Sequence, residues 1–119
     1  MKFNWITLHV ADMERSRGFY GDYLGMTLVR EFTQPGGRRF CFYASEDGMQ
    51  VELIAQEGAE TVSASGLSLG VAVKDYDRLL EEARKGGFLA GEPVILGGHL
   101  ECFFAFDPDG VRLQIARGE

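Results

Sequence analysis

Apolar and polar residues alternate strictly near the start of the chain. Ile6, Leu8 and Val10 are apolar, whereas Thr7 and His9 between them are polar. A period of two residues is typical of a β-strand that buries one face and leaves the other for different contacts. The pattern therefore predicts a strand with one apolar and one mixed face.

The hydrophobic spacing changes to that of a helix directly after this strand. Asp12 can cap the helix, and Gly25 suits the left-handed position that ends one. The apolar stripe between them is formed by Phe19, Tyr20, Tyr23 and Leu24. The segment predicts a helix that packs this stripe on the apolar face of the strand.

A second strand and helix repeat this plan from Leu67 onward. Alternation of Leu69, Val71 and Val73 with smaller residues predicts the strand, and Asp75 takes the capping position of Asp12. The second stripe is formed by Tyr76, Leu79, Leu80 and Ala83, before Gly86 and Gly87. Two similar units in 119 residues indicate a fold built by duplication.

Three further strands are predicted in each half, separated by turn sequences. They span Thr27–Phe32, Arg39–Ala44 and Met49–Ala55 in the first half, and Pro93–Leu96, Leu100–Phe106 and Val111–Ala116 in the second. The predicted fold class is α+β, with two tandem βαβββ repeats in a single domain of residues 1–119. Repeat one covers residues 1–56, a small polar linker covers 57–65, and repeat two covers 66–119. We expect the two sheets to curl around a shared cavity, with the helices outside.

Composition narrows the class of protein. A length of 119 residues and a hydrophobic share of 45% fit one globular domain. The net charge of -6 argues against a nucleic-acid surface, and no apolar run reaches membrane length. Met1 and Lys2 precede no apolar leader core, so the expected location is the cytoplasm. Cys41 and Cys102 lie in apolar runs without CxxC spacing, which predicts buried, reduced thiols.

The mixed strand faces are expected to line the cavity, because the apolar faces pack beneath the helices. Gln50 is among the residues that alternation directs there. An aromatic wall with a few polar groups is typical of a small-molecule pocket. The predicted ligand-binding residues are Trp5, Thr7, His9, Glu52, Ser68, Arg112 and Gln114.

Three segments resemble the vicinal oxygen chelate superfamily, which includes glyoxalase I, ring-cleaving dioxygenases, and fosfomycin- and bleomycin-resistance proteins. They are VADMERSRGFYGDYLGM, MQVELIA and FDPDGVRLQI. The first matches the family's V-x-D-x-x-x-S-x-x-FY-x-x-x-LG run, and the last matches its DPDG-x-x-(I/L)-x-(L/I) ending. Together with the repeats, the resemblance covers nearly the whole chain, and it implies a homodimer.

Metalloenzymes of that superfamily hold one divalent ion in the cavity with ligands from four strands. The resemblance places the ligand positions at Trp5, Glu52, Ser68 and Gln114. Only Glu52 is a good ligand, because an indole offers no lone pair and Ser and Gln bind transition metals poorly. We therefore expect no metal ligands and no cofactor. A relocated site on His9 and Glu52 would have two ligands where three are normal.

The role of Glu52 has two interpretations. In the first interpretation, Glu52 forms an ion pair with Arg112, because Gln50 and Arg112 are equivalent positions of the two repeats. In the second interpretation, the Glu52 carboxylate binds a cationic ligand. His99, beside Gly97 and Gly98, is expected to be a solvent-exposed turn residue.

These residues and the resemblance favour a metal-independent protein that binds, and sequesters, a planar or amphipathic small molecule. Trp5 would stack on the ligand, although it could instead fill the space of the missing metal. The alternative is a lyase or dioxygenase that uses zinc, nickel or iron with a non-standard ligand set. A third interpretation makes Glu52 a general base beside Arg112. No catalytic residue is assigned, and neither nucleic acid nor membrane is an expected partner.

Overall fold

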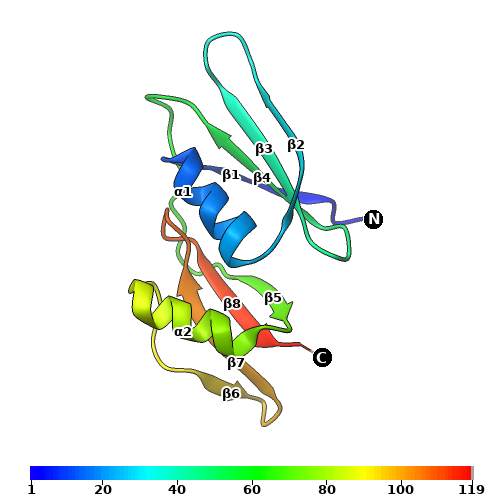
Figure 1. Cartoon of the computed structure of the whole chain (residues 1–119), viewed down its shortest axis with the longest axis vertical. Coiled ribbons are helices and arrows are strands. Elements are labelled where there is room, and N and C mark those ends of the chain that lie inside the picture. The colour runs from blue at the N-terminus through cyan, green and yellow to red at the C-terminus, as the bar shows by residue number, and fades with distance from the viewer. Residues whose placement is uncertain (119) are drawn as a thin grey trace. The chain divides into compact units, whose positions relative to one another are not determined.

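The computed structural model describes residues 1–118. The chain forms two compact units, Met1–Val62 and the part that begins at Ser63. Each unit combines one helical segment with a four-stranded sheet (Figure 1). Among the described residues, no helix has the length and apolar character needed to cross a membrane.

The first unit contains the elements of one βαβββ repeat. In chain order they are β1 (Trp5–His9), α1 (Met13–Arg17), η1 (Gly18–Tyr23), β2 (Thr27–Thr33), β3 (Arg39–Ala44) and β4 (Gln50–Ala55). The strand order in the sheet is β1-β4-β3-β2. The pair β1–β4 is parallel and the other pairs are antiparallel.

The second unit repeats this plan. Its elements are β5 (Leu69–Val73), α2 (Tyr76–Gly86), β6 (Val94–Leu96), β7 (Leu100–Phe106) and β8 (Arg112–Arg117). The strand order is β5-β8-β7-β6, again with one parallel pair, β5–β8. The predicted α+β fold of two βαβββ modules is therefore confirmed.

The strand registers show how closely the two repeats correspond. Phe42 pairs with Glu52 across β3 and β4, as Phe104 pairs with Gln114 across β7 and β8. Gly48, in the turn before β4, has a φ of 91°, which favours glycine. The strand pairing shows that Glu52 and Gln114 occupy equivalent positions, each two residues after the predicted equivalents Gln50 and Arg112.

The first helix differs from the prediction of one regular α-helix. It is α-helical only to Arg17 and then forms the wider turns of a π-helix through Tyr23. The amide of Leu24 donates to the carbonyl of Phe19 at 2.9 Å, five residues back. Phe19 and Tyr23 of the predicted stripe are buried, whereas Leu24 is half-buried at the end of the segment.

The two predicted helix caps have different outcomes. Asp12 has an extended backbone (φ -139°, ψ 105°) and accepts a hydrogen bond from the amide of Arg15 at 3.1 Å, as predicted. Asp75 has φ -89° and ψ 40°, outside the extended range of a capping residue, and makes no capping bond. Asp75 is the N-cap residue of α2, as predicted, but its carboxylate contacts the Arg78 guanidinium at 3.4 Å instead of a backbone amide.

Each unit has its core between the helix and one face of the sheet. Leu53 is buried in the first unit, and Tyr76 of α2 contacts Phe103 of β7 in the second. Both cysteines are buried and unbridged, as predicted. Burial raises the pKa of the Cys41 thiol, so this side chain is uncharged at neutral pH.

The predicted linker belongs in part to the first unit. The amide of Val62 donates to the carbonyl of His9 at 2.7 Å, so residues up to 62 fold beside β1. The boundary between the units falls between Val62 and Ser63, inside the predicted linker of residues 57–65.

Candidate functional site

The sheet of the first unit has a helix side and an opposite side. Tyr43 marks the helix side, because its hydroxyl accepts a hydrogen bond from Arg17 at 3.1 Å. A Cβ added at Gly21 would lie 2.9 Å from the Tyr43 ring, so the helix approaches the sheet closely there. Neighbouring residues of a strand point to opposite faces, so Phe42 lies on the other side. We call that side the site face.

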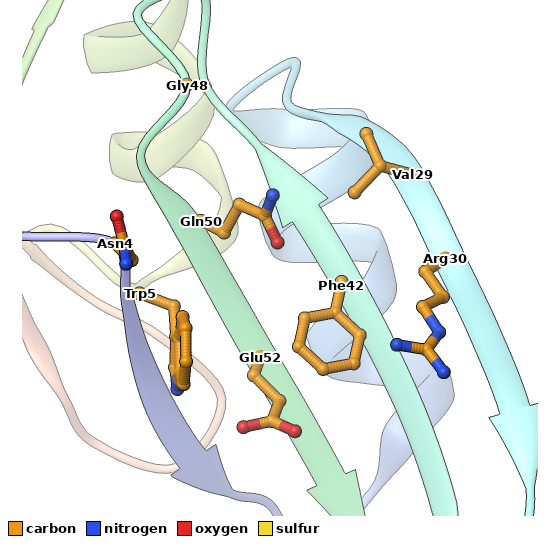
Figure 2. Close-up of a pocket in the computed structure, with 8 residues that line it drawn as sticks. All are labelled: Asn4, Trp5, Val29, Arg30, Phe42, Gly48, Gln50 and Glu52. Carbon is orange, nitrogen blue, oxygen red and sulfur yellow. The ribbon is translucent and has the colours of Figure 1, made fainter.

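A groove of about 590 Å³ lies on the site face (Figure 2). Trp5 stands at one margin of the groove and is 55% exposed. The Phe42 ring lies between the side chains of Glu52 and Arg30 in this view. The groove is lined by Asn4, Trp5, Val29, Arg30, Phe42, Gly48, Gln50 and Glu52.

Backbone pairing places four of the site-face residues in one row across the sheet. Arg30 of β2 pairs with Phe42 of β3, Phe42 pairs with Glu52 of β4, and Glu52 pairs with Thr7 of β1. The row therefore runs from a cation, over an aromatic ring, to a carboxylate and a hydroxyl.

The Glu52 carboxylate is held from one side. The Thr7 hydroxyl donates a hydrogen bond to Glu52 Oε1 at 2.6 Å. Within the first unit, residues 1–62, no hydrogen bond occupies Oε2. A pair of Glu52 with Arg112 stays a prediction. Within its own unit, Arg112 lies over the Phe104 ring, with its guanidinium carbon 4.2 Å from the ring centroid.

Arginine and phenylalanine side chains cover the other end of the row. The guanidinium carbon of Arg30 lies 4.8 Å from the Phe32 centroid and 5.9 Å from the Phe42 centroid. The Phe32 and Phe40 rings are stacked with centroids 4.5 Å apart. These contacts fall in the range of cation–π and aromatic interactions that fix side-chain orientation.

The predicted site residues of the first unit fall into two hollows. Trp5 and Glu52 line the groove, whereas His9 lines a second hollow of about 430 Å³ together with Arg38 and Glu60. Thr7 lines the second hollow and also contacts Glu52. The sequence placed all four side chains on one face correctly, but it did not separate the two hollows.

The predicted site residues of the second unit do not all lie in strands. Arg112 and Gln114 share a strand face with Phe104, and Gln114 Nε2 lies 3.5 Å from Cys102 Sγ. Ser68 precedes β5, so its predicted place within the strand is wrong. That the two units line a shared cavity stays a prediction.

Two groove residues, Val29 and Arg30, could not be predicted from the sequence because β2 contains a bulge. The register shifts between Leu28 and Arg30, where Leu28 pairs with Tyr43 and Arg30 pairs with Phe42. The extra residue turns Arg30 onto the site face and brings Val29 into the groove wall. Phe42 was missed for another reason: both faces of RFCFYA are apolar, so alternation carries no signal there.

The residues at the family's ligand positions do not fit a transition-metal ion. Glu52 is the single carboxylate among them, and its Oε1 already accepts the Thr7 hydroxyl. Within the described residues, no group of three His, Cys, Asp or Glu side chains is close enough to hold an ion. His99, as predicted, is an exposed turn residue, with Nδ1 2.9 Å from the Gly97 carbonyl oxygen.

Comparison with known proteins finds lactoylglutathione lyases among the relatives of this chain. A lactoylglutathione lyase of Haemophilus influenzae is 32% identical over 116 residues, which cover 90% of this chain and 85% of the relative. A probable chloroplastic lactoylglutathione lyase of Arabidopsis thaliana is 31% identical over 118 residues, which cover 92% of this chain. The chain spans only 34% of that plant protein.

Solved structures share the fold. Glyoxalase I from Zea mays aligns with 98% of this chain at a TM-score of 0.83 and 23% identity, and the chain covers 44% of the maize protein. A Sphaerobacter thermophilus member of the glyoxalase/bleomycin resistance protein/dioxygenase superfamily aligns with 99% of this chain. Its TM-score is 0.74, its identity is 20%, and 98% of it is covered.

A model of one protein family matches residues 2–115, almost the full length of the chain. The match begins before β1 and ends within β8, so it covers nearly all of both βαβββ repeats. On this evidence the chain belongs to the Glyoxalase/Bleomycin resistance protein/Dioxygenase superfamily.

Proposed function

We propose that this chain is a metal-independent binding protein for a planar small molecule, held in the groove beside Trp5. The observation that carries the proposal is the indole itself. It is 55% exposed at the margin of a groove whose other walls include Phe42 and the polar side chains of Gln50 and Glu52. An exposed tryptophan beside a few convergent polar groups is the usual composition of a small-molecule site.

The strongest test replaces Trp5. Because Trp5 is the only tryptophan, its fluorescence reports directly on the groove during a screen of flat small molecules. For a molecule that shifts this emission, Trp5→Ala is expected to weaken binding roughly tenfold or more, since stacking and burial of the indole face are lost. Titration calorimetry measures both affinities, because the variant has no tryptophan signal.

Phe3→Ala provides the control for this test. Phe3 is 72% exposed near Trp5 in the sequence and is not among the groove residues. Its replacement should leave the affinity unchanged. A molecule that binds the wild type and Trp5→Ala equally well would contradict the proposed site.

A second candidate is lactoylglutathione lyase activity, because two relatives with that name are 31% and 32% identical to this chain. The donor set of this chain argues against the metal that glyoxalase-type metalloenzymes use, since Glu52 would be the only strong ligand. We therefore expect the protein, purified without a histidine tag or added ions, to contain far less than one transition-metal ion per chain.

Elemental analysis by mass spectrometry checks this expectation on the same samples that are assayed for lyase activity. One ion per chain that disappears in Glu52→Ala would contradict metal independence. Lyase turnover that rises on addition of zinc or nickel would favour the second candidate.

A further inference from the structure

Arg30 differs from two arginines on the helix side of the first sheet. On the helix side, Arg17 lies 3.4 Å from Glu31 and Arg39 lies 3.0 Å from Glu14, so both are ion-paired. Arg30, on the site face, has no carboxylate partner within residues 1–62 of the first unit and packs on aromatic rings instead. A guanidinium stacked in this way keeps its N–H edge free for an anion.

The row across the sheet sets the spacing of the charged groups. Neighbouring strands are about 4.8 Å apart, so the backbones of Arg30 and Glu52 are roughly 10 Å apart, with Phe42 between them. A flat ring that lies along this row beside Phe42 would have the guanidinium at one end and the carboxylate at the other (Figure 2). The two ends of the ligand must therefore differ in chemistry.

The carboxylate end calls for a donor. Glu52 Oε1 accepts the Thr7 hydroxyl, which orients the carboxylate, and Oε2 has no partner within residues 1–62 of the first unit. An ionised carboxylate only accepts hydrogen bonds. A ligand group at this end therefore needs an O–H or N–H, whereas the group at Arg30 needs acceptor oxygens.

We propose that the groove selects a flat aromatic acid that carries an O–H or N–H donor at the end opposite its acidic group. Arg30 binds the acid, Glu52 accepts from the donor, and Trp5 and Phe42 contact the ring. The proposal rests on the binding function proposed above and adds the polarity of the ligand. The chain's net charge of -6 does not oppose it, because contact charges outweigh charges screened beyond about 10 Å at 0.1 M salt.

Four single-ring probes test the two ends separately by titration calorimetry and Trp5 fluorescence. They are para-hydroxybenzoate, benzoate, phenol and para-hydroxybenzamidine. The first should bind most tightly, benzoate should lose the bond to Glu52, and phenol should lose the bond to Arg30. The amidine has the shape of the first probe with the opposite charge, and it should bind about tenfold to hundredfold more weakly.

Two variants assign each end to one side chain. Arg30→Gln should weaken para-hydroxybenzoate about tenfold to hundredfold and leave phenol unchanged. Glu52→Ala, which removes the acceptor, should remove the advantage of para-hydroxybenzoate over benzoate. The matched control is Arg38→Gln, which removes another arginine that stacks on a phenylalanine, Phe40, outside the groove. It should leave the affinity within about twofold, since a charge outside the contact distance is screened.

The outcomes separate this inference from the proposed function. If the amidine shifts Trp5 emission and binds as tightly as the acid, the polarity is overturned while the binding site stands. If Arg30→Gln and Arg38→Gln weaken the acid equally, the role of Arg30 is overturned and only a general charge effect acts. If none of the four probes nor any other flat molecule perturbs Trp5, both the inference and the proposed function fail.

Discussion

Replacing Phe103 with alanine is expected to lower the free energy of unfolding by about 3–5 kcal/mol. Phe103 lies in β7 between β8 and β6, and its side chain has no solvent exposure. Its ring centroid is 5.2 Å from that of Tyr76 in an edge-to-face contact, which joins the sheet to α2. Alanine removes this contact and leaves a cavity that a rigid sheet closes only in part.

Phe106 provides a control from the same strand. It is 43% exposed, so Phe106→Ala removes a similar volume without opening a buried cavity. Urea unfolding followed by circular dichroism should show a large loss for Phe103→Ala and a loss below about 1 kcal/mol for Phe106→Ala. Equal losses in the two variants would mean that the contact between α2 and β7 does not stabilise the fold.

The repeat architecture could be predicted because its signals are local. Alternation in one strand and the helical spacing that follows it can each be read from a few neighbouring residues, as in Ile6, Leu8 and Val10. The second copy then confirms the first, and turn residues such as Gly48 align the later strands. Local periodicity is therefore enough for element order and for the equivalence of Glu52 and Gln114.

The groove could be predicted only in part, because alternation gives the face of a strand and not its register. Trp5, Thr7 and Glu52 were assigned to one face from their own strands. The hydrogen bond from Thr7 to Glu52 depends on the parallel pairing of β1 with β4, which lie 45 residues apart. No local pattern reports that pairing.

For Arg30, the sequence pattern predicts the wrong face of the strand relative to Leu28. In TLVREFT, Leu28 and Arg30 are two residues apart, and regular alternation would place them on one face. The bulge places them on opposite faces, with Leu28 opposite Tyr43 and Arg30 opposite Phe42. No glycine marks the bulge in the sequence, so the cation of the groove is visible only in the structure.

The turn before β8 begins with a buried carboxylate, whereas the equivalent turn of the first unit begins with a serine. Asp107 is 4% exposed, and its Oδ1 accepts from the amides of Asp109 at 2.9 Å and Val111 at 2.8 Å. At the equivalent position, the Ser45 hydroxyl is within hydrogen-bond reach of the Met49 carbonyl, at 3.1 Å, and of the Asp47 carboxylate. That carboxylate also accepts from the Met49 amide at 3.4 Å. Both turns share the backbone pairing, so the side chain is the main difference.

Asp107→Ala is expected to lower the free energy of unfolding by about 3 kcal/mol. The variant loses two charge-assisted hydrogen bonds and leaves the amide of Val111, a buried residue, without its carboxylate partner. Asp107→Asn keeps an acceptor oxygen without the charge, so its loss should be about 1 kcal/mol. Urea unfolding at neutral pH measures both values.

Ser45→Ala is the matched control for the turn. It removes a hydroxyl that contacts the Met49 carbonyl and the Asp47 carboxylate. Because Asp47 is exposed, the change should cost no more than about 1 kcal/mol. If the three variants lose the same stability, the turn backbone alone determines the stability of this hairpin. If only Asp107→Ala shows the large loss, the buried carboxylate holds the turn that positions Arg112 and Gln114 at the start of β8.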